Sequence, residues 1–128
     1  MGDKIIPTVE HIMPQNLSKD WIEDLKNITN NQEDINEKHK EHLNQIGNLV
    51  YINFDSNSSL GNDSFQIKKS SYKDSKWRIL NGSYLDKLEK KNVMSVSNYD
   101  NWDFEIIEKR TEVLSEYVYN IMEDLNFL

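Results

Sequence analysis

The sequence predicts an α+β domain in which two short strands are separated by helices. Residues 5–12 and 49–54 are rich in β-branched and other strand-forming side chains. Between them, and again from residue 102 to residue 125, apolar side chains recur at the spacing of an amphipathic helix. A chain of 128 residues is long enough to bury one core and too short for two ordinary domains. We therefore treat residues 1–128 as a single domain.

Two prolines limit the first predicted strand, because proline has no N–H to donate to a β-ladder. Pro7 lies near its start and Pro14 follows its end. Ser18 is then a favourable N-cap for a helix. The side chains on the apolar face of that helix are Trp21, Ile22, Leu25 and Ile28. The chain therefore changes from strand to helix between residues 14 and 18.

A second helix is predicted between the first helix and the second strand. Asn30 or Asn31 is expected to start it, and Gly47 lies where a helix often ends on a left-handed residue. Its apolar stripe consists of Ile35, Leu43 and Ile46. His39 and His42 border this stripe three residues apart, which is compatible with a shared metal ion or with a solvated face.

The second half of the chain contains two further predicted helices and a polar linker. Asn62 is placed to cap a helix from Asp63 to about Tyr72. A partly helical stretch follows and leads to the polar residues 95–100. The last helix has the most continuous apolar stripe, and we expect it to close the core. The residues of this stripe are Trp102, Ile106, Val113, Leu114, Tyr117, Val118, Ile121, Met122 and Leu125.

Composition limits the kind of protein that this chain can be. The sequence contains no cysteine, which excludes a disulfide framework and a thiolate metal site. It lacks an N-terminal basic segment followed by an apolar run, and it lacks any stretch of about 18 apolar residues. We therefore expect a cytoplasmic protein without a membrane role. The net charge of -7 argues against non-specific affinity for nucleic acid, because Lys and Arg drive phosphate binding.

The basic side chains are unevenly distributed along the chain. Residues 66–91 contain eight basic and three acidic side chains, a local charge of +5 that leaves -12 for the remainder. Such a stretch is either a contact surface for phosphate or an ordinary solvated face. Its candidates for DNA contact are Lys68, Lys69, Lys73, Lys76 and Arg78.

The segment Glu10-His11-Ile12-Met13-Pro14 places an acid and a histidine side by side at the end of the first strand. Strand ends and loops often display reactive groups. A neutral imidazole accepts a proton at working pH, so His11 is a candidate general base. Glu10 points to the other face of a regular strand. A break near Pro14 is therefore needed to bring both groups into one site.

The order of these motifs resembles the HNH nucleases, also called ββα-metal or His-Me finger nucleases. In them a strand-end histidine, a second-strand asparagine and a further Asn or His at the helix entrance surround one divalent metal, and the matching residues here are His11, Asn48 and Asn57. The HxxP signature and Gly47-Asn48-Leu49 are most similar to the C-terminal nuclease domain of GmrSD-type modification-dependent (type IV) restriction enzymes. The similarity covers nearly the whole chain. It continues through residues 57–62, Phe65, Lys68, Trp102, Ile106 and Arg110.

The resemblance implies a fold and a set of residue roles. The implied fold is a ββα-metal core with a helical insertion between the two strands and a long C-terminal helix. His11 would be the general base, and Asn48 would organise the loop that holds it. Glu10 and Asn57 would supply hard oxygen ligands to one Mg²⁺ or Mn²⁺ ion. Asn62 is the alternative to Asn57 as a ligand.

The activity implied by the resemblance is hydrolysis of phosphodiester bonds in foreign or modified DNA. Lys68 matches a family lysine and is expected to face phosphate. The expected partners are DNA and a separate nucleotide-binding N-terminal domain or subunit, so the chain would be a fragment or a stand-alone relative of a larger restriction protein. Two alternatives stay open, a non-catalytic DNA-binding or protein-docking module on the same scaffold and RNA as the substrate. The oligomeric state also stays open.

Overall fold

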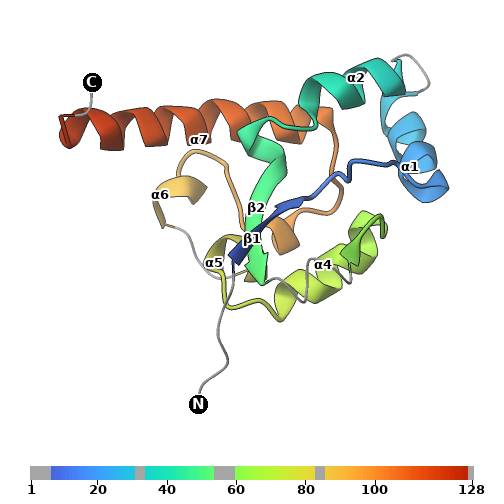
Figure 1. Cartoon of the computed structure of the whole chain (residues 1–128), viewed down its shortest axis with the longest axis horizontal. Helices are drawn as coiled ribbons and strands as arrows, with labels where there is room; N and C mark the ends of the chain where they lie inside the picture. Colours follow the sequence, from blue (N-terminus) through green and yellow to red (C-terminus); the bar gives the residue numbers. More distant parts are fainter. Residues whose placement is uncertain (1–6, 31–33, 54–59, 83–85, 127–128) are drawn as a thin grey trace.

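The computed structural model describes residues 7–30, 34–53, 60–82 and 86–126, and it has the α+β class that the sequence predicts (Figure 1). The strands are β1 (Pro7–His11) and β2 (Leu49–Asn53). The helices and 3-10 turns that the described residues form are α1 (Lys19–Thr29), α2 (Ile35–His42), η1 (Ile46–Asn48), α4 (Phe65–Lys73), α5 (Arg78–Asn81), α6 (Asp86–Glu89), η2 (Val96–Asn98) and α7 (Phe104–Asp124).

β1 and β2 form an antiparallel two-stranded sheet. The register pairs His11, the last residue of β1, with Leu49, the first residue of β2. A backbone hydrogen bond from Ile12 N to Asn48 O, at 3.0 Å, extends this pairing beyond the strands. α1 and α2 lie between the two strands in the chain, as the predicted helical insertion requires.

One face of the sheet is covered and the other meets solvent. Ile52 is buried on the covered face, whereas its neighbour Tyr51 is 61% exposed on the opposite face. α4 lies against the covered face, where Lys68 and Tyr72 contact Glu10 of β1. The carboxylate of Glu10 therefore points into the protein and towards α4.

Three aromatic residues form the centre of the core. The ring centroid of Phe65 lies 6.4 Å from that of Trp21 and 5.6 Å from that of Trp102. Trp21 Nε1 also donates a hydrogen bond to Asp63 O at 2.7 Å. These residues come from α1, α4 and the segment before α7, so parts of the chain that are distant in sequence meet beside the sheet.

The first two helices each begin after a capping residue, and the predicted cap is correct for α1 but not for α2. Ser18 caps α1 as predicted, and its Oγ accepts a hydrogen bond from Trp21 N at 3.3 Å. α2 begins after Asp34, whose side chain accepts from the first turn. The predicted start at Asn30 is wrong, because Asn30 ends α1 with a left-handed φ of 55°. Asn31 lies outside the described residues.

Two further predictions about helix ends are wrong. Ser64 caps α4, which begins at Phe65, so Asn62 is not the N-cap. Gly47 lies within η1 and is not in the left-handed region. A Cβ atom at Gly47 would lie 2.2 Å from Ile107 O. Glycine is therefore required there because η1 packs directly on the backbone of α7.

The long helix α7 packs on the core along its first half. It begins after Asp103, which caps it, so Trp102 precedes the helix. The buried side chains of α7 are Phe104, Ile107, Arg110 and Val113. From Tyr117 onward the apolar stripe continues at the surface, and Leu125 is 60% exposed. The expectation that this helix closes the core therefore holds for its first half only, and its last turns extend beyond the rest of the fold (Figure 1).

Among the helices that the structure describes, none combines the length and the apolar character required to cross a bilayer.

Candidate functional site

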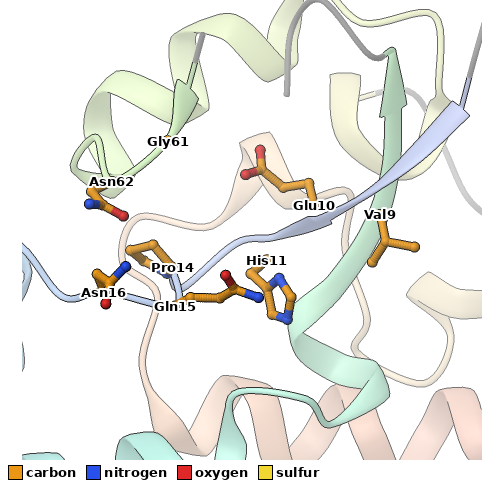
Figure 2. Close-up of a pocket in the computed structure, with 8 residues that line it drawn as sticks. All are labelled: Val9, Glu10, His11, Pro14, Gln15, Asn16, Gly61 and Asn62. Atoms are coloured by element: carbon orange, nitrogen blue, oxygen red, sulfur yellow. The ribbon is translucent and has the colours of Figure 1, made fainter. Parts of the chain in front are cut away.

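A cavity of about 320 Å³ lies at the end of β1 (Figure 2). Glu10 and His11 leave the strand on opposite sides, yet both line this cavity. The remaining lining residues are Val9, Pro14, Gln15, Asn16, Gly61 and Asn62. The structure thus brings two of the sequence-predicted site residues together with the alternative metal ligand Asn62.

His11 is half-buried and is held at both its backbone and its side chain. Its carbonyl oxygen accepts a hydrogen bond from Lys68 Nζ at 2.9 Å. Its ring nitrogen Nε2 lies 2.8 Å from Asn44 Oδ1, in the turn that follows α2. A ring that is fixed in place and lines a cavity has the position that a general base needs.

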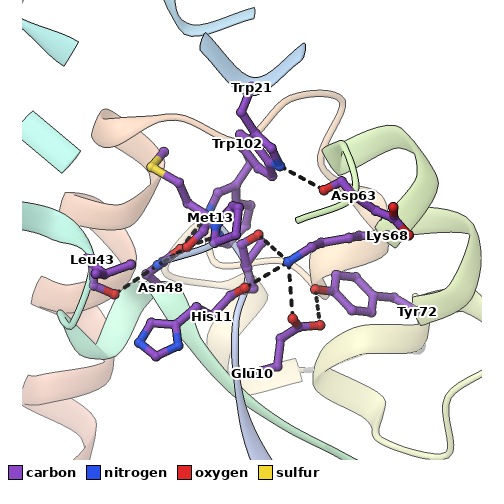
Figure 3. A network of polar contacts seen from close by, with 12 residues as sticks. Glu10, His11, Met13, Trp21, Leu43, Asn48, Asp63, Lys68, Tyr72 and Trp102 are labelled. Atoms are coloured by element: carbon purple, nitrogen blue, oxygen red, sulfur yellow. Dashed lines mark hydrogen bonds and ion pairs between the residues drawn. The ribbon is translucent and has the colours of Figure 1, made fainter. Parts of the chain in front are cut away.

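Glu10 is only 2% exposed although it carries a carboxylate. Its Oε1 accepts a hydrogen bond from Lys68 Nζ at 3.1 Å, and its Oε2 accepts one from the Tyr72 hydroxyl at 2.8 Å (Figure 3). Burial raises the pKa of the Glu10 carboxyl, while the charge of Lys68 and the hydrogen bond from Tyr72 oppose that rise. Because each carboxylate oxygen has a second lone pair, these contacts leave Glu10 with acceptor capacity.

Lys68 is fully buried, which corrects the expectation that it faces phosphate. Its Nζ donates to the carboxylate of Glu10 at 3.1 Å, to His11 O at 2.9 Å and to Ile12 O at 3.0 Å. Three acceptors match the three protons of an ammonium group. Burial lowers the pKa of Lys68, and the Glu10 carboxylate opposes this shift. The reason for the burial is that Lys68, four residues before the buried Tyr72, lies on the face of α4 that packs on the sheet.

Asn48 is also fully buried, and its side chain makes four hydrogen bonds (Figure 3). Its Oδ1 accepts from Met13 N at 2.8 Å and from Trp102 Nε1 at 3.0 Å. Its Nδ2 donates to Met13 O and to Leu43 O, each at 2.9 Å. These bonds use the two donors and two lone pairs of an amide. Asn48 therefore joins the segment after β1 to the end of α2 and to the segment before α7.

The two histidines of α2 have separate partners and do not share a site. His39 Nε2 lies 2.7 Å from Pro14 O, so α2 also holds the segment after β1. His42 is buried, with Nδ1 2.6 Å from Lys38 O and Nε2 2.7 Å from a carboxylate oxygen of Glu108. Within the described part of the chain, no group of three or more His, Asp or Glu side chains is arranged to hold a metal ion.

The other basic candidates for DNA contact lie nearer the surface than Lys68. Lys73, Lys76 and Arg78 are exposed, and Lys69 is half-buried. They follow one another from α4 to the start of α5. Their contact with DNA stays a prediction.

The side chains at the cavity offer the types of donor atom that a hard divalent cation binds. Glu10 contributes a carboxylate and Asn62 an amide oxygen, which are donors that Mg²⁺ and Mn²⁺ accept. Asn57 lies outside the described residues, so its place on a metal stays a prediction. Because the ammonium of Lys68 lies 3.1 Å from the carboxylate of Glu10 and offsets its charge, we expect the protein alone to bind a cation weakly.

Sequence reasoning missed two side chains that hold this site. Tyr72 donates to Glu10, and Asn44 contacts the ring of His11. The four-residue spacing of Lys68 and Tyr72 places them on one helix face and could have linked them. Asn44 had no comparable signal, because its contact depends on the path of the turn after α2.

Most of the chain matches one known protein family. The chain matches the family described as GmrSD restriction endonucleases, C-terminal domain, over residues 2–117. No curated protein and no solved structure matches it. The matched range contains both strands, α4 and every residue of the cavity. Since it covers much more than half of the sequence, the chain belongs to the family of C-terminal domains of GmrSD restriction endonucleases.

Proposed function

We propose that this domain is a metal-dependent DNA endonuclease of the HNH, or ββα-metal, type that acts in the restriction of foreign or modified DNA. The observation that carries the proposal is the meeting of Glu10, His11 and Asn62 at one cavity, in a chain of the GmrSD C-terminal family. In this proposal β1 and β2 are the two strands of the nuclease core, and α4, which comes after them in the chain, is its helix.

Hydrolysis of a phosphodiester bond requires a group that takes a proton from water. We assign this role to His11, whose ring lines the cavity and whose carbonyl is fixed by Lys68. Asn48 is assigned the organising role. Because Asn48 binds both the N–H and the carbonyl of Met13, it fixes the segment that follows the base.

One Mg²⁺ or Mn²⁺ ion is the proposed cofactor, with Glu10 and Asn57 as its ligands and Asn62 as the alternative to Asn57. Carboxylate and amide oxygens are donors that such hard cations prefer. When bound, the ion would stabilise negative charge on the phosphate and on the leaving oxygen. Lys68 and Tyr72 orient Glu10, because each donates to one of its two carboxylate oxygens.

DNA is the proposed substrate, and Lys69, Lys73, Lys76 and Arg78 are its proposed contacts outside the cavity. The net charge of -7 predicts weak DNA binding by the isolated domain. We therefore propose that a separate nucleotide-binding N-terminal domain or subunit helps to select the DNA, as the family resemblance implies.

Nicking of a supercoiled plasmid tests the proposed function. We expect cleavage in Mg²⁺ or Mn²⁺, none in EDTA, and a loss of at least about a hundredfold in rate for His11→Ala. The unfolding midpoint of His11→Ala should stay close to that of the wild type. Asn120→Ala, at an exposed position of α7, is the control and should cleave normally. Undiminished cleavage by His11→Ala would refute the role of His11.

The same assay separates the nuclease from the non-catalytic alternative. A wild-type domain that shifts DNA in a gel but leaves the plasmid intact with every divalent metal favours a DNA-binding module. Repeating the assay with single-stranded RNA decides between the two nucleic acids as substrate.

A further inference from the structure

The ring of His11 has a polar neighbour to which the proposed function assigns no role. Asn44 Oδ1 lies 2.8 Å from His11 Nε2, although the two residues are 33 positions apart in sequence. Asn44 is exposed and does not line the cavity. Asn44 therefore contacts the ring of the proposed base from the turn that follows α2, outside the cavity.

The chemistry of this contact defines the state of the imidazole. An amide oxygen is an acceptor and has no proton to give. His11 Nε2 must therefore donate, which places a proton on that nitrogen. In the neutral ring the other nitrogen, Nδ1, then carries the lone pair that can accept a proton.

The backbone that carries Asn44 is fixed on both sides. Leu43 O accepts a hydrogen bond from Asn48 Nδ2 at 2.9 Å, and Leu43 N donates to His39 O at 2.9 Å. On the other side, Gln45 N donates to His42 O at 3.1 Å. Because this turn is tied both to α2 and to Asn48, the amide of Asn44 is presented to His11 from a rigid support.

We propose that Asn44 is a positioning residue for the hydrolytic step. Its side-chain oxygen holds the Nε2–H of His11, which orients the ring and keeps Nδ1 as the atom that accepts the proton of water. This proposal rests on the proposed nuclease function, in which His11 is the base. The charged neighbours on the other side of β1 are Glu10 and Lys68. Lys68 donates to the carboxylate of Glu10 and to the backbone carbonyl of His11, and these contacts do not involve the side-chain amide of Asn44.

Two substitutions at Asn44 test the proposal. Asn44→Ala removes the acceptor, whereas Asn44→Asp keeps an oxygen at the same place. We expect Asn44→Ala to lower kcat for plasmid or oligonucleotide cleavage by about tenfold to a hundredfold with little change in KM. Asn44→Asp should recover most of the loss. Both variants should keep the wild-type unfolding midpoint, because the position is exposed.

A spectroscopic readout makes the test independent of cleavage. In protein labelled with ¹⁵N-histidine, long-range ¹H–¹⁵N spectra of the neutral ring should show the proton of His11 on Nε2 in the wild type. In Asn44→Ala the spectra should shift towards a mixture of the two ring forms. A proton found on Nδ1 in the wild type, or wild-type kcat in Asn44→Ala, would overturn the proposal. If the wild type fails to cleave while the spectra change as expected, the nuclease function fails and the contact stands.

Discussion

A buried lysine of α4, whose ammonium group lies at the end of β1, illustrates how single residues build this site. The resemblance, in which Lys68 matches a family lysine, predicts that this side chain faces phosphate. Instead, its three protons are taken by the carboxylate of Glu10 and by two consecutive backbone carbonyls. A charge that is buried with matched acceptors fixes geometry, whatever its net effect on stability. The strand end that carries His11 is held in this way.

Removing the charge of Lys68 should therefore destabilise the protein strongly. We predict that Lys68→Met lowers the free energy of unfolding by about 3–5 kcal/mol, because the carboxylate of Glu10 is left buried without its cation. Urea unfolding followed by tryptophan fluorescence measures this change. Lys73→Met, on the exposed side of α4, is the matched control and should change stability by less than about 0.5 kcal/mol. Equal effects of the two substitutions would show that Lys68 is not buried as described.

The raised pKa of Glu10 gives a prediction for the pH dependence of stability. As the pH rises from the ordinary value of 4.5, the unfolded chain releases this proton before the folded protein does. The folded state then binds more protons, so the contribution of Glu10 to the free energy of unfolding falls as the pH rises through its raised pKa. Glu10→Gln removes this slope.

Urea unfolding at pH 4.5 to 7 in EDTA, with wild type and Glu10→Gln side by side, measures the effect. The difference in free energy of unfolding, wild type minus variant, should fall with increasing pH. A difference that rises with pH would mean that the ion pair with Lys68 outweighs burial and lowers the pKa of Glu10.

Residue-level reasoning from sequence identified some members of the site and not others. Glu10 and His11 could be placed at a strand end because the proline that follows marks that end. Asn48 follows from the family resemblance alone, in which it matches the second-strand asparagine. Lys68 was assigned the wrong surroundings and Asn44 was missed, because both depend on how α4 and the α2 turn pack on the sheet. Such packing has no signature in the local sequence.

At the scale of elements, the helical insertion explains how the segment after β1 is held. His39 Nε2 contacts Pro14 O directly. Leu43 O accepts a hydrogen bond from Asn48, whose side chain in turn binds the backbone of Met13. Next to β2, η1 packs on α7, where Arg110 Nε donates to Gly47 O at 2.9 Å. The insertion therefore holds the segment that follows β1, and the last helix holds the residues that precede β2.

The contact between η1 and α7 gives a prediction about Gly47. A Cβ atom at this position would lie 2.2 Å from Ile107 O, which belongs to the backbone and cannot rotate away. We predict that Gly47→Ala lowers the free energy of unfolding by about 1–3 kcal/mol or more. Because Asn48 follows directly, plasmid cleavage by the folded variant should fall as well.

A second glycine provides the control for this prediction. Gly61 has a φ of +46° and open space where a Cβ would lie. Gly61→Ala therefore suffers only the backbone penalty of a left-handed residue, about 1–2 kcal/mol. Thermal unfolding of both variants measures the difference, and a Gly61→Ala variant less stable than Gly47→Ala would contradict the packing described for η1.

Element types could be predicted from the sequence more reliably than their ends. The strands, the first helix and the last helix follow from β-branched runs and helical stripes. The start of α2 and the cap of α4 were misplaced because several residues in each stretch are good caps, and packing selects Asp34 and Ser64 among them. The exposed second half of α7 was also unexpected, since an apolar stripe does not reveal whether a partner surface covers it.

At the scale of the whole molecule, distant segments converge on the end of β1. Trp102 donates to Asn48 and lies 5.2 Å from the guanidinium of Arg110, measured from the ring centroid. Both residues belong to the motif series that resembles the GmrSD family. Here Trp102 binds the side chain of Asn48, and Arg110 binds the carbonyl of the preceding residue, Gly47. The family match ends at residue 117, where the stripe of α7 becomes exposed. Among the described residues, all the buried ones therefore lie within the matched range.

The location of the metal is the most direct test of this account. Crystals soaked in Mn²⁺ and measured at a wavelength with anomalous scattering from manganese show where the ion binds. We predict one ion at the cavity, about 2.0–2.2 Å from a carboxylate oxygen of Glu10 and from the amide oxygen of Asn57 or Asn62, with His11 lining the same space. An ion bound away from Glu10, or no ion in the cavity at Mn²⁺ concentrations that support cleavage, would contradict the proposed active site.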